Sequence, residues 1–167
     1  QSFPDWTEVS MLQPAKTTRH GWQRTASTGE RLSTAMAVFG ANAAGKTALL
    51  KPLAFIHWFL SDSFNAPADS PIPVTPHEAF PEEPVEFEVI VDDSNGELLK
   101  YALRATQDRV LHESVYRKKP SGRYSYVFIR DWNESTSSYD IKQQSFGMSP
   151  AEAKKVRADA SLIATGV

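Results

Sequence analysis

The residues whose types and spacing could bind a phosphate group lie between positions 40 and 47. Gly40 is followed after four residues by Gly45, Lys46 and Thr47, which is the spacing G-x-x-x-x-G-K-[ST] of a phosphate-binding loop. The glycines allow backbone angles that turn successive N–H groups toward one anion. The lysine adds a positive charge against the β- and γ-phosphates, and the threonine hydroxyl is a ligand for Mg2+. The spacing therefore predicts a nucleotide site.

Two elements are expected to position this loop. The apolar run over Ser33–Phe39 predicts a buried core strand that is covered on both faces. A helix is predicted from Lys46 to about Ser61, with its partially positive N-terminus aimed at the anion. Pro52 lies near the start of this helix, where a missing N–H costs less than in the interior. The predicted buried face follows the 3.6-residue period and consists of Leu49, Leu50, Leu53, Ile56, Phe59 and Leu60.

Composition indicates a soluble globular protein. The chain has 167 residues, of which 41% are hydrophobic and 23% charged, and its net charge of -2 gives no support for nucleic-acid binding. There is no cysteine, which excludes disulfides and thiolate metal sites. No apolar run reaches the roughly 18 residues that a membrane span needs, because Lys51, Pro52 and His57 interrupt the most hydrophobic stretch. A cytoplasmic location without a membrane partner is expected.

Four segments are predicted along the chain. Residues 1–64 form a strand-loop-helix core, and six prolines make residues 65–84 an extended connection. Period-two alternation predicts an antiparallel β-subdomain over residues 85–145. Residues 146–167 begin a helical segment, with Ser149, Pro150 and Glu152 as a capping-box start. The predicted strands are residues 8–12, 33–39, 85–91, 98–105, 110–118, 123–132 and 138–141, with tight turns at residues 93–96 and 119–122.

The termini indicate a piece of a longer protein. The chain starts at Gln1 rather than at a methionine and ends within an apolar stretch. The helical segment at residues 146–167 is therefore expected to be truncated. The alternative is a processed form of a complete small protein.

Other polar groups have competing interpretations. The strand ending at Asp92 imitates the acidic strand that binds Mg2+ in nucleotide hydrolases, but a hairpin strand with alternating glutamates explains it better. His112 with Glu113, and Asp131 with Glu134, could act as acids and bases, but their setting favours solvated surface. All five residues are therefore interpreted as structural.

A basic and aromatic cluster flanks the predicted turn at residues 119–122. Such a mixture can contact nucleic acid, although exposed hairpin ends are commonly charged, and the structural interpretation is favoured. Trp22, upstream of the phosphate-binding loop, could stack on adenine or be a partly buried loop residue. The cluster consists of Arg117, Lys118, Lys119, Arg123, Tyr116, Tyr124 and Tyr126.

With GANAAGKT after VF and before ALLKPLAFI, and with a proline-rich connection and a meander downstream, the chain resembles the N-terminal lobe of AAA-family ATP-binding proteins with ABC-type heads. This branch includes SMC and RecF proteins and OLD-type bacterial defence ATPases. The resemblance implies an α/β P-loop NTPase fold with a parallel core strand, a helix and an antiparallel β meander. It also places Gln1–Phe3 and Glu8–Met11 in the family's first strand and its continuation. Ala43 stands where many relatives have glycine.

The resemblance implies ATP and Mg2+ as cofactors. Lys46 would be the catalytic cation on the β- and γ-phosphates, and Thr47 would bind the metal. Gln143 or Gln144 could be a further ligand of Mg2+ or water, by residue type only. The implied nucleotide-binding residues are Gly40, Asn42, Ala43, Ala44, Gly45, Lys46, Thr47 and Ala48.

The leading hypothesis is an ATP-binding part of an ATPase head that serves DNA maintenance or phage defence. Its hydrolysis would require a C-terminal lobe and a second head in a homodimer, so the isolated chain is expected to be inactive. Nucleic acid or a defence effector could be a partner of the full assembly. The alternative is a non-hydrolytic interaction module with a vestigial nucleotide site. A small kinase or GTPase is disfavoured, because lid arginines and an Asn-Lys-x-Asp motif are missing.

Overall fold

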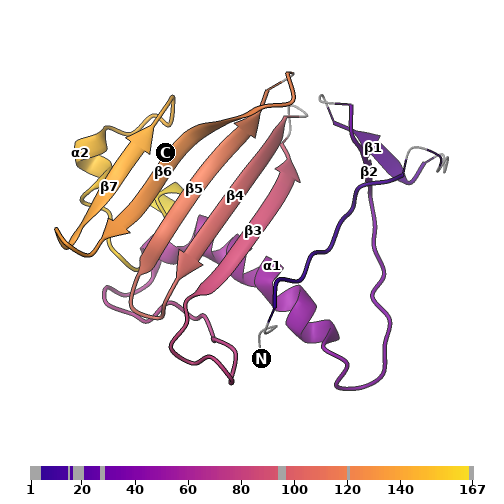
Figure 1. The fold of residues 1–167 in the computed structure, drawn as a ribbon, viewed down its shortest axis with the longest axis horizontal. Helices are drawn as coiled ribbons and strands as arrows, with labels where there is room; N and C mark the ends of the chain where they lie inside the picture. The colour runs from indigo at the N-terminus through magenta and orange to yellow at the C-terminus, as the bar shows by residue number, and fades with distance from the viewer. Residues whose placement is uncertain are drawn as a thin grey trace.

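A five-stranded antiparallel sheet carries a long helix on one face (Figure 1). The computed structural model describes residues 5–14, 16, 21–26, 29–93, 97–119 and 121–165. Each strand pairs with the next one along the chain, which confirms the predicted meander. The strands are β3 (Val85–Asp92), β4 (Leu98–Ala105), β5 (Val110–Lys118), β6 (Tyr124–Asn133) and β7 (Ser138–Gln143).

Alternation along β3 shows why this sheet has two different faces. Val85, Phe87 and Val89 pack against the hydrophobic core, whereas Glu86 and Glu88 are exposed. At one end of the hairpin between β3 and β4, Asp93 and Glu97 are joined by a backbone hydrogen bond of 2.8 Å. The other predicted turn residues here, 94–96, and residue 120 of the second turn lie outside the described residues.

Helix α1 (Lys46–Ser61) has the predicted bounds but a different buried face. Ile56 and Phe59 are buried, and the ring of Phe55 stacks on Phe87 of β3 with centroids 5.1 Å apart. Leu50 and Leu53 are 51% and 58% exposed, so their predicted burial is wrong. The helix has apolar residues on more than one side, and the sheet contacts the aromatic side.

The predicted core strand before the phosphate-binding loop is wrong. Residues 35–41 are extended but unpaired, and Phe39 is 89% exposed. The nearest strand is β2 (Arg31–Ser33), which pairs antiparallel with β1 (Gln23–Thr25). A parallel strand needs neighbours that satisfy its backbone groups, and no strand of the described residues runs beside 35–41. The described part of the chain thus lacks the parallel core strand.

The predicted strand at residues 8–12 is also wrong. Leu12 forms an isolated antiparallel bridge with Leu32, and no longer ladder develops there. The implied first-strand residues Gln1–Phe3 lie outside the described residues. Local alternation was too short here to specify a partner strand.

The proline-rich connection is irregular, as predicted, but it is held against the core. After the 3-10 turn η1 (Ser63–Asn65), the chain buries Ile72 and Val74. The N–H of Ile72 donates to the carbonyl of Gln107 at 2.7 Å, and the Gln107 amide donates to the carbonyl of Val74 at 3.2 Å. The connection is therefore a packed part of the fold.

The C-terminal segment begins with the predicted capping box. Ser149 Oγ accepts a hydrogen bond from the N–H of Glu152 at 3.3 Å, and the Glu152 carboxylate accepts one from the N–H of Ser149 at 2.9 Å. Helix α2 (Pro150–Ala153) is only four residues long and is followed by turns and the 3-10 turn η2 (Ile163–Thr165). No helix in the described residues is long and apolar enough to span a membrane.

A buried ion pair lies on the helix-bearing side of the sheet. Glu113 of β5 and Arg130 of β6 are cross-strand neighbours, and neither is exposed to solvent. Arg130 Nη1 lies 3.6 Å from Glu113 Oε2. The prediction that Glu113 belongs to a solvated surface is wrong, because its partners come from a part of the chain far away in sequence.

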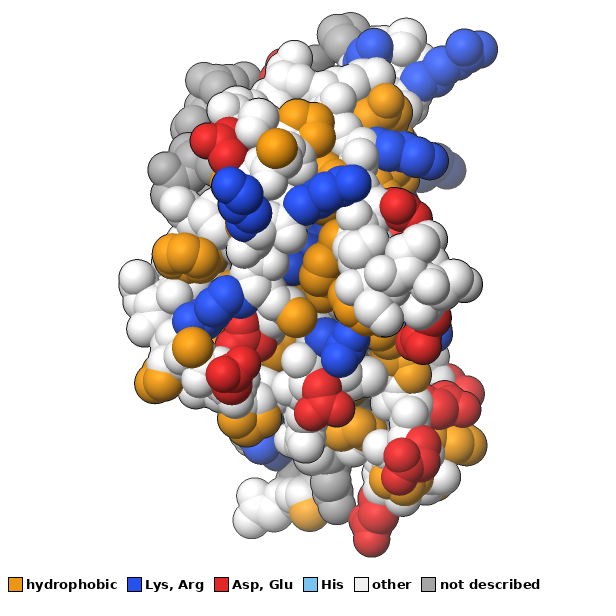
Figure 2. Space-filling model, turned by 90° about the vertical axis from the view of Figure 1, so that its left-hand side faces the viewer, with side chains coloured by type: hydrophobic (Ala, Val, Ile, Leu, Met, Phe, Trp, Pro, Cys, Tyr) orange, Lys and Arg blue, Asp and Glu red, His pale blue; other side chains and the backbone are white. Residues whose placement is uncertain are grey.

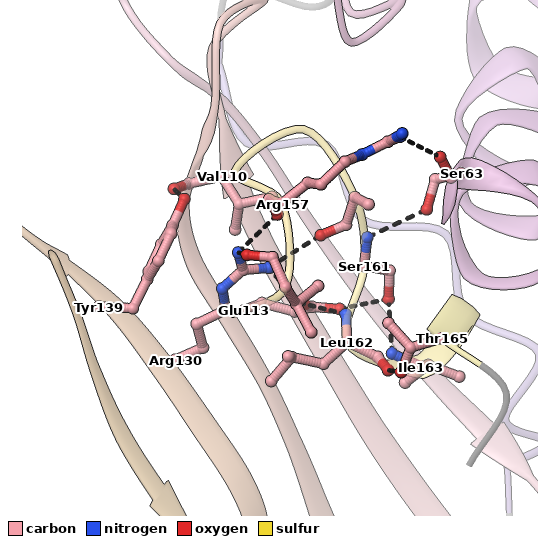
Figure 3. Close-up of polar contacts among 12 residues, drawn as sticks. Ser63, Val110, Glu113, Arg130, Tyr139, Arg157, Ser161, Leu162, Ile163 and Thr165 are labelled. Carbon is pink, nitrogen blue, oxygen red and sulfur yellow. Dashed lines mark hydrogen bonds and ion pairs between the residues drawn. The ribbon is translucent and has the colours of Figure 1, made fainter. Parts of the chain in front are cut away.

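Those partners are main-chain and hydroxyl groups of the C-terminal segment (Figure 3). Glu113 accepts hydrogen bonds from the Ser161 hydroxyl at 2.5 Å and from the N–H of Leu162 at 3.1 Å. Arg130 donates to the carbonyls of Ala160 and Arg157, both at 2.8 Å. A buried charge pair is tolerated only when its remaining hydrogen bonds are made, and the C-terminal segment makes them.

The same segment holds the turn η1, which directly follows α1. The N–H of Ser161 donates to Ser63 Oγ at 3.0 Å. The Arg157 guanidinium donates to the carbonyls of Ser63 at 3.1 Å and Ala66 at 2.9 Å. Sheet, helix and C-terminal segment are therefore joined in one network.

The replacement Glu113→Ala should lower the free energy of unfolding by about 3 to 5 kcal/mol, because it leaves Arg130 charged and buried without its partner. Urea denaturation followed by circular dichroism measures this loss. Glu86→Ala, at the exposed pair with Arg104, should change the stability by less than about 1 kcal/mol. Equal losses in the two variants would contradict a special role for the buried pair.

The hydrogen bonds from Ser149 lower the pKa of the Glu152 carboxyl. Because the folded pKa is lowered, the box stabilises the protein above the unfolded pKa, and this contribution disappears as the pH falls through the folded pKa. Ser149→Ala should raise the pKa of Glu152 toward its ordinary value in an NMR titration of the carboxyl carbons. Ser138→Ala, on β7, should leave that pKa unchanged.

Candidate functional site

The candidate site is the loop of residues 40–47 that leads into α1. Gly45 forms the helix N-cap with φ of 84°, and Ala43 has φ of 63°. Both residues are thus in the left-handed region, which costs a residue with a Cβ atom about 1 to 2 kcal/mol. Strain of this kind persists where the surrounding chain requires a particular loop shape.

The Lys46 side chain bends back over the loop. Its ammonium donates to the carbonyls of Gly40 at 2.6 Å and Ala41 at 2.5 Å. A Cβ atom on Gly40 would lie 3.4 Å from the Ala44 side chain and 3.8 Å from that of Lys46. These are ordinary contact distances, so the position of the lysine depends on its hydrogen bonds rather than on the absence of a side chain at position 40.

The N-terminus of α1 is open to an anion. Its N-cap residue makes no side-chain capping bond, and the first turn contains no acidic residue. The first N–H groups of a helix have no partner within the helix and carry a partial positive charge. Thr47 is exposed in this first turn. A phosphate and its metal ion could therefore approach these groups without displacing a side-chain cap.

The remaining predicted loop residues lie in the same short stretch. Asn42, Ala43 and Ala44 are exposed in the turn, and Ala48 is half-buried in the first turn of α1. Their nucleotide-binding role stays a prediction. The structure adds the bonds of Lys46 and the left-handed backbone at Ala43, which the spacing of residue types did not reveal.

The other candidate ligands of the metal are placed elsewhere. Asp92 ends a hairpin strand, and its Oδ2 lies 2.7 Å from Arg24 Nε, which agrees with the structural interpretation. Gln143 and Gln144 lie at the end of β7, at the opposite edge of the sheet from β3. Within the described residues, no three His, Asp or Glu side chains form a metal-binding group. Trp22 is 63% exposed before β1.

A serine, a histidine and an aspartate form a second polar group on the sheet. His112 Nδ1 lies 2.6 Å from Asp131 Oδ1, and its Nε2 lies 2.8 Å from Ser114 Oγ. Ser114 is completely buried, so its hydroxyl cannot reach a substrate. We interpret the group as a structural link between β5 and β6. Glu134 is exposed in the following turn, as predicted.

Comparison with known families gives a match that contains the candidate site. The family model described as "AAA domain, putative AbiEii toxin, Type IV TA system" matches residues 35–149, more than half of the chain. The matched region includes the whole phosphate-binding loop, α1 and the five-stranded sheet. No match was found among curated proteins or among solved structures.

Gly45→Ala should distort the loop, because alanine disfavours a φ of 84°. We expect a loss of about 1 to 2 kcal/mol in unfolding free energy, with amide NMR shifts changed at residues 40–49. Gly122→Ala is the matched control, because Gly122 has φ of 80° in the hairpin between β5 and β6. Its shift changes should be confined to that hairpin. Unchanged loop amides in Gly45→Ala would contradict the geometry described.

Proposed function

The chain belongs to this AAA-domain family, and from that premise we propose that it binds ATP with Mg2+ through residues 40–48 as part of an ATPase head. The observation that carries the proposal is the loop itself. Lys46 lies over it, and the uncapped N-terminus of α1 opens onto it. In this proposal a phosphate takes the place of the Gly40 and Ala41 carbonyls as the partner of Lys46, and Thr47 contributes its hydroxyl to the metal.

We further propose that the head is of the ABC type and that a C-terminal lobe completes it. Residues 35–41 pair with no strand among the described residues, and Phe39 is almost fully exposed. Leu50 and Leu53 of α1 are exposed as well. Strands of a second lobe beside residues 35–41 would pair this backbone and cover these side chains.

Hydrolysis in this proposal depends on groups from that lobe and from a second head in a homodimer. The acidic strand end at Asp92 is engaged with Arg24, which leaves the activation of water to other residues. The isolated chain is then expected to bind ATP weakly and to hydrolyse it hardly at all.

The biological setting is proposed from the family. Its description names a toxin of a type IV toxin–antitoxin system, which is compatible with a defence role. We propose a cytoplasmic ATPase of DNA maintenance or phage defence, with nucleic acid or a defence effector as a partner of the full assembly.

A second candidate function is a non-hydrolytic interaction module with a vestigial nucleotide site. It is favoured by the hydrogen bonds of Lys46, whose ammonium already has two carbonyl partners within its own loop. In this case the sheet would contact a protein partner and the loop would have a structural role.

Lys46→Ala should weaken binding of Mg2+-ATP by about ten- to a hundredfold, because a hydrogen bond to a charged group contributes about 1.5 to 3 kcal/mol. Isothermal titration calorimetry of the 167-residue chain measures this. Lys51→Ala, an exposed lysine later in α1, is the matched control and should bind like the unaltered chain.

Two other outcomes would decide against parts of the proposal. ATP turnover by the isolated chain that Lys46→Ala abolishes would contradict the need for a second lobe. Failure of the unaltered chain to bind ATP with Mg2+ at millimolar concentration would favour the interaction module.

A further inference from the structure

We infer that the face of the sheet opposite α1, at the end near the hairpin between β5 and β6, binds single-stranded nucleic acid. This inference deepens the proposed function, on which its biological setting rests, by naming the surface and the chemistry of one partner. The surface has an aromatic centre and a basic rim. The centre consists of Lys100, Tyr116, Lys118, Tyr124 and Tyr126, and the rim consists of Lys119, Arg123 and Lys142.

An irregularity in the pairing of β5 with β6 creates the aromatic centre. Val115 lies opposite Phe128 and both pack in the core, but the next pair is Tyr116 opposite Tyr126. One residue of β6 is therefore extra, and such a bulge redirects the side chains that follow. Without it, strict alternation would turn Tyr126 toward the same side as Phe128. The bulge brings the tyrosines together on the face away from the helix.

Lysines lie over these tyrosine rings. Lys100 Nζ is 5.6 Å from the ring centroid of Tyr116 and 5.5 Å from that of Tyr124, and Lys118 Nζ is 6.0 Å from that of Tyr124. Tyr124 is 38% exposed. Cations close to exposed aromatic rings can contact phosphates while the rings stack on bases. Both lysines also pair with a carboxylate, Lys100 with Glu88 at 3.2 Å and Lys118 with Glu30. The centre therefore contributes mainly aromatic surface, and the cations that would contact phosphates belong to the rim.

The rim adds cations that the protein does not neutralise. The three side chains of the rim are exposed, and no ion pair joins them to an acidic side chain in the described part of the chain. Seen from the β7 side, lysine and arginine gather toward the hairpin end and acids toward the other end (Figure 2). This segregation supplies a local positive field in a chain whose net charge is -2.

The opposite end of the same face limits the binding surface. Glu86, Asp131 and Asp140 lie there, each within an ion pair or a hydrogen bond. A phosphate backbone would meet carboxylates in this region and is expected to stay at the hairpin end. A sheet face with aromatic rings suits unpaired bases, because duplex DNA does not offer its base faces for stacking.

The test uses the 167-residue chain and a fluorescently labelled oligothymidylate of about twenty nucleotides. We expect salt-dependent binding in fluorescence anisotropy, with log K falling by about 0.7 per phosphate contact for each unit of log salt. Tyr124→Leu keeps the apolar bulk but removes the ring, and it should weaken binding about tenfold. The double variant Arg123→Glu with Lys142→Glu should weaken binding at least as much and reduce the salt slope.

Matched controls separate this surface from the nucleotide site. Lys51→Glu reverses an exposed charge on α1 and should bind the oligonucleotide like the unaltered chain. Lys46→Ala should lose ATP but keep the oligonucleotide, so that failure of one proposal leaves the other measurable. Circular dichroism melting curves confirm that each variant is folded.

Several results would overturn the inference. The first is that the unaltered chain does not bind the oligonucleotide at low salt, and the second is that Lys51→Glu loses as much affinity as the double variant. The third is that a duplex of the same length binds more tightly than the single strand. The fourth is that vesicles rich in phosphatidylserine bind as tightly as the oligonucleotide. By contrast, loss of binding in a Tyr124→Leu variant that remains folded would support stacking, because a purely charged surface would not need the ring.

Discussion

Glu113 and Arg130 face each other from neighbouring strands without any exposure to solvent, and charges in such a position must be matched nearly completely. The sheet alone cannot match them. Backbone groups of residues 156–162 supply the missing partners, and this fixes an otherwise irregular segment against the sheet. A four-residue helix and a 3-10 turn would have little stability without that attachment.

The attachment also determines where the phosphate-binding loop lies. Residues of the C-terminal segment hold Ser63 in the turn after α1, and the Ser63 hydroxyl in turn donates to the carbonyl of Phe59 in the helix. The Phe55 ring also stacks on Phe87 of the sheet. Because the helix is held at these two places, the direction of its axis is fixed, and so is the position of its N-terminus. The loop is thus oriented from the helix side, whereas the extended residues 35–41 on the other side contribute no strand pairing.

Local signals explain which parts of the fold could be predicted. The motif sets the start of α1, alternation sets β3 to β7, and Ser149 with Glu152 sets the capping box, because each signal lies within a few neighbouring residues. The errors involve distant partners. The burial of Glu113 depends on Ser161 and Leu162, and the strand before the loop required neighbours that local alternation does not specify. In the site, the spacing of the motif predicted which residues take part, but the hydrogen bonds of the Lys46 ammonium become visible only in the folded loop.

The attachment of α1 to the C-terminal segment has a consequence for synthesis on the ribosome. Strands β3 to β7 pair in chain order, so the sheet can form from neighbouring hairpins as they emerge. Helix α1 and the turn after it emerge earlier, but Ser63 in that turn cannot bind Ser161 until Ser161 has left the exit tunnel. The phosphate-binding loop therefore waits for residues that lie far later in the sequence before its position is set.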